Sequence, residues 1–480
     1  EKEIEKTQDE IDAGLRDFAD PRAGGAPRPP RGLRMAESPF WNPKTETMPR
    51  EELRRLQGHR LARAVERAYA GSAFHRRLFD EHGVTPGDIR GYDDLVKLPF
   101  TTRDAWMDSQ AANLPYGEML LRPAESAIRY HTTSGTTGRM PLRVLDGRTD
   151  WKWIAECWCY AFHGFGIRPH DIVFFAFSYG TFIGFWGAHY ACEKMGCLVL
   201  PSGNMTTQGR VELIEQMGAT VVCATPTYAL RLAQEARDMG IDLPGGSVKR
   251  LILSGEPAGS IPASKRLIEE QWGAKAADTA GMTEIGTIMM FESENQPGGC
   301  HILEDHFIEE VIDPETGRSL DYGEQGERVV TSFGRSSLPL IRYRTRDLVI
   351  KVPHTTSSCG RTWDLYDGGI RGRVDDMLLI RGTNVYPRAV EAIVREYPAV
   401  DEFQIYLWTK DGIRDEIAVR CEVRAGFEDQ WDAVARRLRE DLSSNTEGLG
   451  FDVERVGAGT LPRFELKARR VLDDRVVKGS

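Results

Sequence analysis

At 480 residues, the chain is too long for one compact domain and long enough for two or three. Its hydrophobic, charged and aromatic contents of 41%, 28% and 9% argue against disorder or a fibrous repeat. A net charge of −10 disfavours a nucleic-acid binder, whose affinity would rest on basic clusters. No apolar run approaches the roughly 18 residues of a membrane span, so we expect no membrane partner.

The chain start and the cysteines bear on cellular location. The N-terminus has neither the basic start nor the apolar core of a signal peptide, so we expect a cytoplasmic protein. The eight cysteines are scattered and form no CxxC pair, which argues against a disulfide scaffold in a chain of this size.

Two segments precede the main body of the chain. Within the first twenty residues, Ile4, Ile11, Leu15 and Phe18 recur at helical spacing among charges, which predicts a short amphipathic helix. A Pro/Gly/Arg-rich stretch at 20–34 follows as a linker. The helix could dock on the body, dock on a partner subunit or stay a loosely attached arm, so the sequence leaves a homodimer open.

The next 300 residues alternate helix and strand signals. Apolar residues recur at helical spacing from Leu53 to Ala68. Short apolar runs that predict buried strands follow at 168–177, 197–201, 219–226 and 250–257, with amphipathic stretches at 210–218 and 227–240. This alternation predicts α/β layers with a largely parallel sheet. Active sites in such sheets lie at the carboxyl ends of the strands.

The pattern changes beyond about residue 376. Strand signals at 378–382, 402–408, 416–423 and 451–459 enclose helix signals at 386–398 and near Gln430–Asp441, which predicts a small α+β unit. We therefore expect an N-terminal helix and linker at 1–35, a large domain at 36–374 and a small domain at 375–480.

The most informative segment reads TTSGTTGRMP, at 132–141, directly after the strand-like AIRYH. Five Thr/Ser hydroxyls and two glycines fill its first seven positions. Glycines let successive backbone N–H groups converge on an anion, and the hydroxyls add donors. The pattern is not the Walker loop. It indicates a phosphate cradle, with a flexible Ser/Thr/Gly surface loop as the plain alternative.

Four other clusters carry groups that suit a nucleotide. In AGMTEIG, Thr283 and Glu284 offer a hydroxyl and a carboxylate that suit Mg²⁺. Asp347 ends the strand-like run at YRTRD and could accept both hydroxyls of a ribose. Arg373 lies with two carboxylates in GRVDD at the domain boundary, and Lys467 follows a Leu-Pro in LPRFELKARR. Each cluster alone could be surface charge, but surface charge does not explain their joint order.

The chain resembles the adenylate-forming superfamily of acyl-CoA synthetases, peptide-synthetase adenylation domains and luciferases through the order of TSGTTG, GMTE, YRTRD, GRxDDM and a late lysine. It is most similar to the phenylacetate–CoA ligase branch, from about Asn42 to the C-terminus. The resemblance implies a large α/β domain with a small mobile α+β domain. It also implies ATP, Mg²⁺ and coenzyme A, and activation of a carboxylic acid as an acyl-adenylate with release of pyrophosphate.

The resemblance also assigns roles to matching positions. The nucleotide would be bound through its phosphates by Thr133, Ser134, Gly135, Thr136, Thr137 and Gly138, through adenine by Gly255, Glu256, Pro257, Ala280, Gly281 and Met282, and through ribose by Asp347 with Arg373 nearby. Glu284 would hold Mg²⁺, with Thr283 beside it. Asp375 would be the hinge of the small domain, and Lys467 would be the catalytic lysine.

Charge explains why the first reaction step needs such residues. A carboxylate must approach the α-phosphate, so the site must neutralise charge that spreads in the transition state. The ammonium of Lys467 stays charged and is a compact donor to both anions. In the second step a thiol attacks the acyl-adenylate and Lys467 must leave, which explains a small domain on a hinge.

The nature of the acid is indicated by SYGTFIGFWG, at 178–187. Tyr179, Phe182, Gly184 and Phe185 match the acyl-pocket segment of the branch, and Trp186 adds another ring. Aromatics beside glycines suit a flat ring that enters a slot, with plain core packing as the alternative for some of them. An aromatic acid is expected, a ring-substituted benzoate before phenylacetate, because the segment is bulky.

Three features depart from the pattern of the branch. Ala280 stands where relatives carry a tyrosine that stacks on adenine. The phosphate segment ends in GRMP, one residue longer than usual and without a lysine. The zinc site of many relatives is eroded, because Ser293 replaces one cysteine and only Cys359 remains of a CxCG pair. We expect no structural zinc, with a site rebuilt on neighbours as the alternative: Cys300, His301, His306 and His354.

Two further hypotheses stay beside a CoA ligase. An adenylating enzyme of natural-product biosynthesis would pass the acyl group to a carrier-protein thiol or an amine. A non-catalytic nucleotide sensor is disfavoured, because Glu284, Asp347 and Lys467 are all present.

Overall fold

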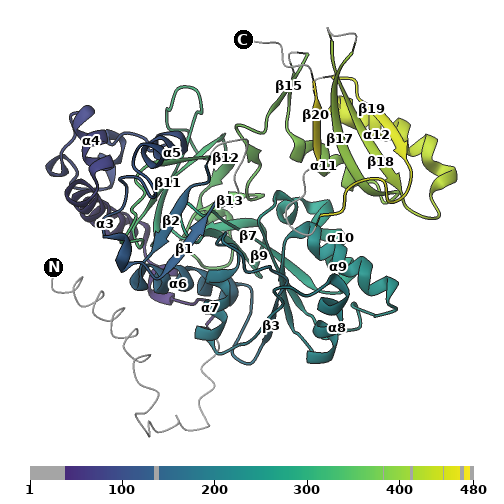
Figure 1. Ribbon diagram of the computed structural model, residues 1–480, viewed down its shortest axis with the longest axis horizontal. Coiled ribbons are helices and arrows are strands. Elements are labelled where there is room, and N and C mark those ends of the chain that lie inside the picture. Colours follow the sequence, from purple (N-terminus) through teal and green to yellow (C-terminus); the bar gives the residue numbers. More distant parts are fainter. Residues whose placement is uncertain are drawn as a thin grey trace, which may run out of the picture. The chain divides into compact units, whose positions relative to one another are not determined.

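The computed structural model describes residues 38–133, 140–381, 383–410, 414–446, 448–464 and 470–475 (Figure 1). The α-helices are α2 (Pro43–Glu46), α3 (Arg50–Gly71), α4 (Ala73–Glu81), α5 (Arg103–Ala112), α6 (Arg148–Gly164), α7 (Trp186–Met195), α8 (Thr207–Met217), α9 (Pro226–Asp238), α10 (Pro262–Trp272), α11 (Pro387–Arg395) and α12 (Trp431–Ser444). The strands up to residue 312 are β1 (Arg129–Thr132), β2 (Arg143–Asp146), β3 (Ile172–Phe175), β4 (Leu198–Pro201), β5 (Val221–Ala224), β6 (Arg250–Ser254), β7 (Lys275–Gly281), β8 (Ile288–Ser293), β9 (Gln296–Ile302) and β10 (Phe307–Ile312). The later strands are β11 (Gln325–Ser332), β12 (Tyr343–Val352), β13 (Leu365–Asp367), β14 (Gly372–Arg373), β15 (Leu378–Ile380), β16 (Thr383–Val385), β17 (Val400–Lys410), β18 (Arg414–Val423), β19 (Asp452–Val456) and β20 (Val471–Asp474).

One large mixed sheet forms the centre of the N-terminal part. Its strand order is β10-β11-β12-β13-β9-β8-β7-β6-β5-β3-β4, with β14 paired to β12. Strands β4, β3, β5, β6 and β7 are parallel, whereas β8 joins β7 antiparallel and the strands beyond it continue so. The prediction of a largely parallel sheet is therefore wrong for the sheet as a whole. Short turns join β7, β8 and β9, and a short turn permits only antiparallel pairing.

Helices cover both faces of the parallel half. Along β3, Val173 and Phe175 belong to the core that includes α6 and α7. Phe174, between them, belongs to the core that includes α8, α9 and α10. Successive side chains of a strand point to opposite faces, so β3 is buried on both sides. This explains why the apolar runs of these strands are continuous.

The helices of the parallel half begin and end on residues that suit helix termini. Helix α9 begins after Thr225, whose Oγ1 accepts a hydrogen bond from the backbone N–H of Tyr228, and Pro226 occupies its first position. Three helices end at a glycine in the left-handed conformation: Gly196, Gly218 and Gly273. Each cap fixes where the chain leaves the helix and turns back toward the sheet.

The C-terminal part has its own sheet and core. Its sheet runs β19-β18-β17-β20, with β17 and β18 antiparallel and the outer strands parallel to their neighbours. Side chains of α11 and α12 share a hydrophobic cluster with this sheet, including Val390, Phe403 and Leu438. The predicted fold class, a large α/β domain followed by a small α+β domain, is confirmed. Mobility of the small domain and the residue boundaries of the domains stay predictions.

Two single elements also bear on the predictions. The predicted helix from Leu53 to Ala68 lies within α3, and its apolar residues face a buried cluster. The sequence pattern places Asp347 at the end of a strand. Strand β12 runs from Tyr343 to Val352, so Asp347 lies within the strand instead. The predicted N-terminal helix and linker lie outside the described residues. Among the helices that are described, none is long and apolar enough to cross a bilayer.

Candidate active site

The carboxyl ends of three parallel strands bring predicted segments to one edge of the sheet. The aromatic segment 178–187 follows β3, segment 255–257 follows β6, and segment 282–284 follows β7. Because the carboxyl ends of parallel strands lie at the same edge, the candidate acyl, adenine and magnesium residues share this edge.

The turn after β6 is fixed by its backbone and by one carboxylate. Gly255 has a φ of 95°, in the left-handed region that favours glycine. Glu256 Oε2 accepts hydrogen bonds from Thr227 N at 3.0 Å and Thr227 Oγ1 at 2.7 Å. Thr227 lies in the first turn of α9, where the helix dipole favours a negative charge. The short 3-10 helix η5 (Pro257–Ser260) follows directly and begins at the last residue of this predicted adenine segment.

The second predicted adenine segment lies where the sheet changes from parallel to antiparallel. Ala280 pairs with Met290 of β8, and Gly281 pairs with Ile288 after a shift in register. A Cβ at Gly281 would lie 2.5 Å from the carbonyl oxygen of Thr287, so this close approach requires glycine. Met282 packs against the main core.

A single arginine links the predicted magnesium residue to the start of the phosphate segment. Glu284 is 3% exposed, and its Oε1 accepts a hydrogen bond from Arg103 Nη1 at 2.7 Å. The same guanidinium donates to Thr133 Oγ1 through Nη2 at 3.3 Å. Arg103 is the first residue of α5, after the capping residue Thr102. The sequence analysis does not find Arg103, although a cation at a helix N-terminus opposes the helix dipole and could have signalled a special role.

The backbone of Thr283 and Glu284 is held by a buried ion pair. Arg335 Nη1 donates to the carbonyl oxygens of Glu284 at 2.6 Å and Thr283 at 3.4 Å. Its Nε and Nη2 donate to the two carboxylate oxygens of Asp146 at 2.7 and 2.9 Å, and both side chains are fully buried. Arg335 and Asp146 therefore position the backbone of Thr283 and Glu284 from inside the protein. Sequence reasoning does not find this pair either.

The predicted ribose and hinge residues share one cation. Asp347 and Arg373 are opposite each other in β12 and β14, and Arg373 Nη1 donates to Asp347 Oδ1 at 3.2 Å. The Nε and Nη2 of Arg373 donate to the carboxylate of Asp375, in the turn that follows, at 3.0 and 3.2 Å. Burial raises the pKa of Asp347, although Arg373 opposes the rise. Burial would also raise the pKa of Asp375, but the hydrogen bonds and charge of Arg373 outweigh it and lower this pKa.

The phosphate segment is described only at its two ends. Thr133 N donates to Leu142 O at 3.1 Å, and Leu142 N donates to Thr133 Oγ1 at 3.1 Å. These two bonds join the two described ends of the segment. Ser134, Gly135, Thr136, Thr137 and Gly138 lie outside the described residues, as does Lys467. Their assigned roles stay predictions.

The aromatic segment after β3 packs ring against ring. Phe177 contacts Tyr179 and Phe182 edge to face, with ring centroids 4.8 and 5.0 Å apart. A Cβ at Gly184 would lie 2.4 Å from the ring of Phe177, so glycine permits this packing. Phe185 is 4% exposed and packs in the core, whereas Tyr179 and Phe182 are partly exposed. Of the predicted acyl residues, Tyr179, Phe182 and Gly184 therefore remain accessible.

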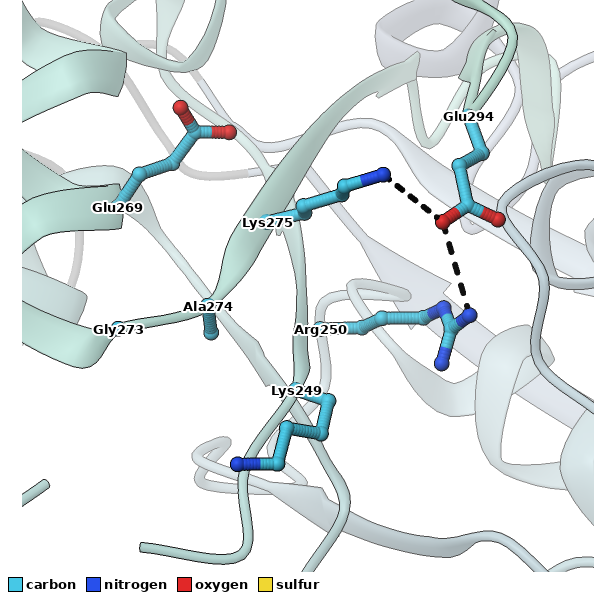
Figure 2. Close-up of a pocket in the computed structure, with 7 residues that line it drawn as sticks. All are labelled: Lys249, Arg250, Glu269, Gly273, Ala274, Lys275 and Glu294. Carbon is cyan, nitrogen blue, oxygen red and sulfur yellow. Dashed lines mark hydrogen bonds and ion pairs between the residues drawn. The ribbon is translucent and has the colours of Figure 1, made fainter. Parts of the chain in front are cut away.

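A separate hollow lies at the opposite edge of the sheet (Figure 2). It has a volume of about 410 Å³ and lies by Arg250 and Lys275, the first residues of β6 and β7. Glu294 pairs there with Lys275 at 3.2 Å and Arg250 at 3.6 Å, and Lys249 points away from it. Because its charges pair with one another and it lies away from the carboxyl ends of the strands, this hollow is not the candidate active site.

The residues considered for zinc do not converge. Cys359 Sγ lies 3.3 Å from His301 Nε2, but the thiol of Cys300 faces the carbonyl oxygen of Asp278. His354 lies near Asp364 instead. Within the described ranges, no three or more His, Cys, Asp or Glu residues form a group that could hold a metal ion.

Comparison with known proteins defines the class of enzyme. The family model described as "AMP-binding enzyme" matches residues 94–334, and the model described as "AMP-binding enzyme C-terminal domain" matches residues 382–475. The chain belongs to the AMP-binding enzyme family. Within it, the chain is 36% identical to the phenylacetate-coenzyme A ligase of Thermus thermophilus over 453 residues, covering 90% of this chain and 99% of the relative. The chain therefore belongs to the phenylacetate–CoA ligase branch of the adenylate-forming acid–CoA ligases, a class of enzymes that use ATP, Mg²⁺ and coenzyme A.

Solved structures give the same fold. The 2-hydroxyisobutyryl-CoA ligase in the postadenylation state with R3-HIB-AMP is 30% identical and superimposes with a TM-score of 0.86, covering 94% of this chain and 95% of that one. The same ligase with 2-HIB-AMP and CoA in the thioesterification state is 31% identical and gives a TM-score of 0.70, again covering 94% of this chain and 95% of that one. The adenylate-forming fold predicted from the sequence is therefore confirmed.

Proposed function

We propose that the acid activated by this chain is aromatic, benzoate-like or phenylacetate-like, and that coenzyme A accepts the acyl group. The observation that supports the aromatic acid is the ring cluster at the carboxyl end of β3. Tyr179 and Phe182 are partly exposed there and pack on Phe177 with centroid separations of 4.8 and 5.0 Å. Edge-to-face packing of this kind extends readily to the flat ring of a ligand.

In this proposal, the nucleotide lies across the carboxyl ends of β6 and β7. The backbone at Gly255 and Gly281 would border adenine, and Asp347 would accept the ribose hydroxyls. Asp347 is fit for this role because it is 7% exposed and paired with Arg373, so its orientation is set before the ligand binds. Lys467 would neutralise the carboxylate and the α-phosphate as they approach each other.

Glu284 and Thr283 suit the magnesium ion that accompanies ATP. A carboxylate and a hydroxyl are hard oxygen donors of the kind Mg²⁺ takes. Arg103 already pairs with Glu284 at 2.7 Å, which shows that this carboxylate accepts a cation partner at the edge of the phosphate segment. When bound, the ion would neutralise charge on the pyrophosphate leaving group.

The test is ATP–pyrophosphate exchange over a panel of acids: phenylacetate, benzoate, amino- and hydroxybenzoates, and 2-hydroxyisobutyrate as an aliphatic control. The proposal expects exchange with at least one aromatic acid at ten times the rate with the control or more, and an acyl-CoA product once CoA is added. Exchange with the aliphatic acid alone would refute the aromatic assignment. An adenylate that reacts with an amine or a carrier-protein thiol but not with CoA would replace the acceptor.

A further inference from the structure

Two arginines of the small domain are linked to the two ends of segment 256–260, one directly and one through Thr227. The segment begins with predicted adenine-binding residues. Arg388 lies in the first turn of α11 and contacts the end of this segment. Arg470 lies directly before β20 and contacts the residue that holds its beginning. Arg388 and Arg470 are together called the arginine clamp below.

Arg388 joins two segments of the large domain. Its Nη2 donates to Ser260 Oγ at 2.8 Å and to the carbonyl oxygen of Gly368 at 2.9 Å. Ser260 also bonds the buried carboxylate of Asp278, which attracts Arg388. A Cβ at Gly369 would lie 3.0 Å from Asp278 Oδ2, so little space remains around this carboxylate. The guanidinium therefore meets a surface that is built around the buried carboxyl of Asp278, whose pKa burial raises to about 7.

Arg470 makes bonds inside the small domain and across to the large one. It is 9% exposed, and it donates to Glu402 Oε1 through Nε at 3.0 Å and to Glu391 Oε1 through Nη1 at 3.3 Å. Its Nη2 donates to Thr227 Oγ1 at 3.4 Å. Thr227 Oγ1 in turn donates to Glu256 at 2.7 Å, and Glu256 attracts Arg470 electrostatically. The chain Arg470–Thr227–Glu256 thus runs from the small domain into the predicted adenine segment.

We propose that the arginine clamp positions the small domain for adenylate formation and is released for thioester formation. The inference rests on the proposed function in one respect, the role of Lys467 in the first half-reaction. Lys467 lies three residues before Arg470 in the chain. Arg470 itself is held on both domains, by Glu402 of the small domain and by Thr227 of the large one.

The positions of these contacts in the chain make the clamp specific to one half-reaction. Ser260 and Thr227 come before the predicted hinge at Asp375, and both arginines come after it. Rotation of the small domain about Asp375 must therefore break both contacts. The chain, with the clamp formed, superimposes on the relative's postadenylation state with a TM-score of 0.86 and on its thioesterification state with one of 0.70. The clamp thus accompanies the arrangement that is more similar to the postadenylation state.

The experiment measures both half-reactions in Arg388→Met and Arg470→Met, which keep length but lose the charge. The rate of adenylation, measured as pyrophosphate release, should fall at least tenfold in each variant. Thioester formation from a supplied acyl-adenylate should stay within twofold of the unmodified enzyme. Ser260→Ala and Thr227→Val remove only the large-domain partners and leave both arginines in place. They should also lower adenylation and spare thioester formation, and they keep the test valid if loss of Arg470 unfolds the small domain.

A matched control is Arg266→Gln. Arg266 also joins the domains, through Glu396 at 2.9 Å, but both side chains are more than half exposed. Exposed pairs contribute little, so both half-reactions should stay within twofold. Equal loss of both half-reactions in folded clamp variants, or unchanged adenylation in them, would overturn the proposal.

Hydrogen exchange separates failure of the clamp from failure of the proposed function. Backbone amides of 225–228 and 256–260 should exchange faster in Arg388→Met and Arg470→Met than in the unmodified enzyme, with no acid present. Lys467→Ala should leave this exchange unchanged. If no acid supports adenylation, the proposed acid is wrong, and the exchange data still decide whether the clamp holds the two domains together.

Discussion

Two carboxylates of the candidate site are each paired with an arginine from another part of the chain. Arg103 meets Glu284 from 181 residues away, and Arg373 meets Asp347 across a pair of strands. Both carboxylates are buried, so without a cation their charge would be costly. The pairing sets each acid in one orientation, and it leaves a site that holds matched charges before ATP arrives.

The proposed catalytic lysine, Lys467, gives the most direct prediction at this scale. Lys467→Ala should abolish adenylate formation, by more than a hundredfold, because no other predicted residue neutralises both reacting anions. Thioester formation from a supplied acyl-adenylate should persist, since Lys467 has no part in that step. Pyrophosphate exchange and product analysis from the two starting points measure this. Equal loss in both half-reactions would remove Lys467 from its assigned role.

Arg103→Met tests the pair beside the phosphate segment. Removing the cation leaves Glu284 buried and unpaired, which we expect to lower the free energy of unfolding by about 3 kcal/mol. Adenylation should fall at least tenfold as well, because Thr133 loses the same partner. Urea unfolding and pyrophosphate exchange measure the two effects. The control is Arg54→Met, whose pair with Asp93 is exposed and should change stability by less than about 1 kcal/mol.

The sequence predicts these residues unevenly. Asp347, Arg373 and Asp375 could be named because they stand in two short motifs, and the structure brings them onto one guanidinium. Arg103 could not be named, because its partner lies far along the chain and only the three-dimensional fold shows the pair. Nothing local distinguishes a buried arginine such as Arg335 from an exposed one.

At the scale of elements, β7 marks a change in how the chain builds its sheet. The strands before it are separated by α-helices and pair in parallel, whereas the strands after it are joined without α-helices and pair antiparallel. The alternation of helix and strand signals made the parallel half predictable. The antiparallel half has no α-helix between its strands, so periodicity alone does not reveal which strands pair. The predicted adenine residues Ala280 and Gly281 lie at this change.

Gly281→Ala tests the closeness of β7 and β8. The added methyl would lie 2.5 Å from the carbonyl oxygen of Thr287, a backbone atom that cannot move aside without shifting β8. We expect a loss of about 1–3 kcal/mol in stability and a rise of at least tenfold in the KM for ATP. Gly203→Ala is the control, since an added Cβ there meets nothing within 4 Å. Normal ATP kinetics in Gly281→Ala would show that this approach does not shape the adenine site.

At the scale of the whole molecule, buried histidines set the response to acid. Burial lowers the pKa of His75 to about 4, that of His131 to about 4 and that of His301 to about 3. Their unfolded values lie near 6.5, so between these limits the unfolded chain binds more protons than the folded one. The contribution of these histidines to stability is therefore greatest above pH 6.5 and falls as the pH drops toward 4, whereas the buried carboxyls of Glu46 and Asp278, whose pKa values burial raises to about 7, act in the opposite direction.

His75 gives this effect a magnitude. It is completely buried, and lowering the pH from 7 to 5 should cost about 2 kcal/mol of stability through this residue alone. His75→Gln should reduce the drop in unfolding temperature between pH 7 and pH 5, even if it lowers stability at both. The exposed His59 supplies the control variant His59→Gln. An unchanged pH dependence in His75→Gln would show that other groups cause the loss.

The single guanidinium shared by Asp347 and Asp375 has a consequence for product release. If AMP leaves the proposed ribose site at Asp347, the attraction between Arg373 and Asp347 changes, and the attraction between Arg373 and Asp375 changes with it. Linkage requires the reverse effect to be of equal size, so a rotation at the proposed hinge, Asp375, would alter the affinity for AMP by the same factor. The order in which AMP and the thioester depart would then be set by the chain, through one charge, and would respond to the concentration of AMP.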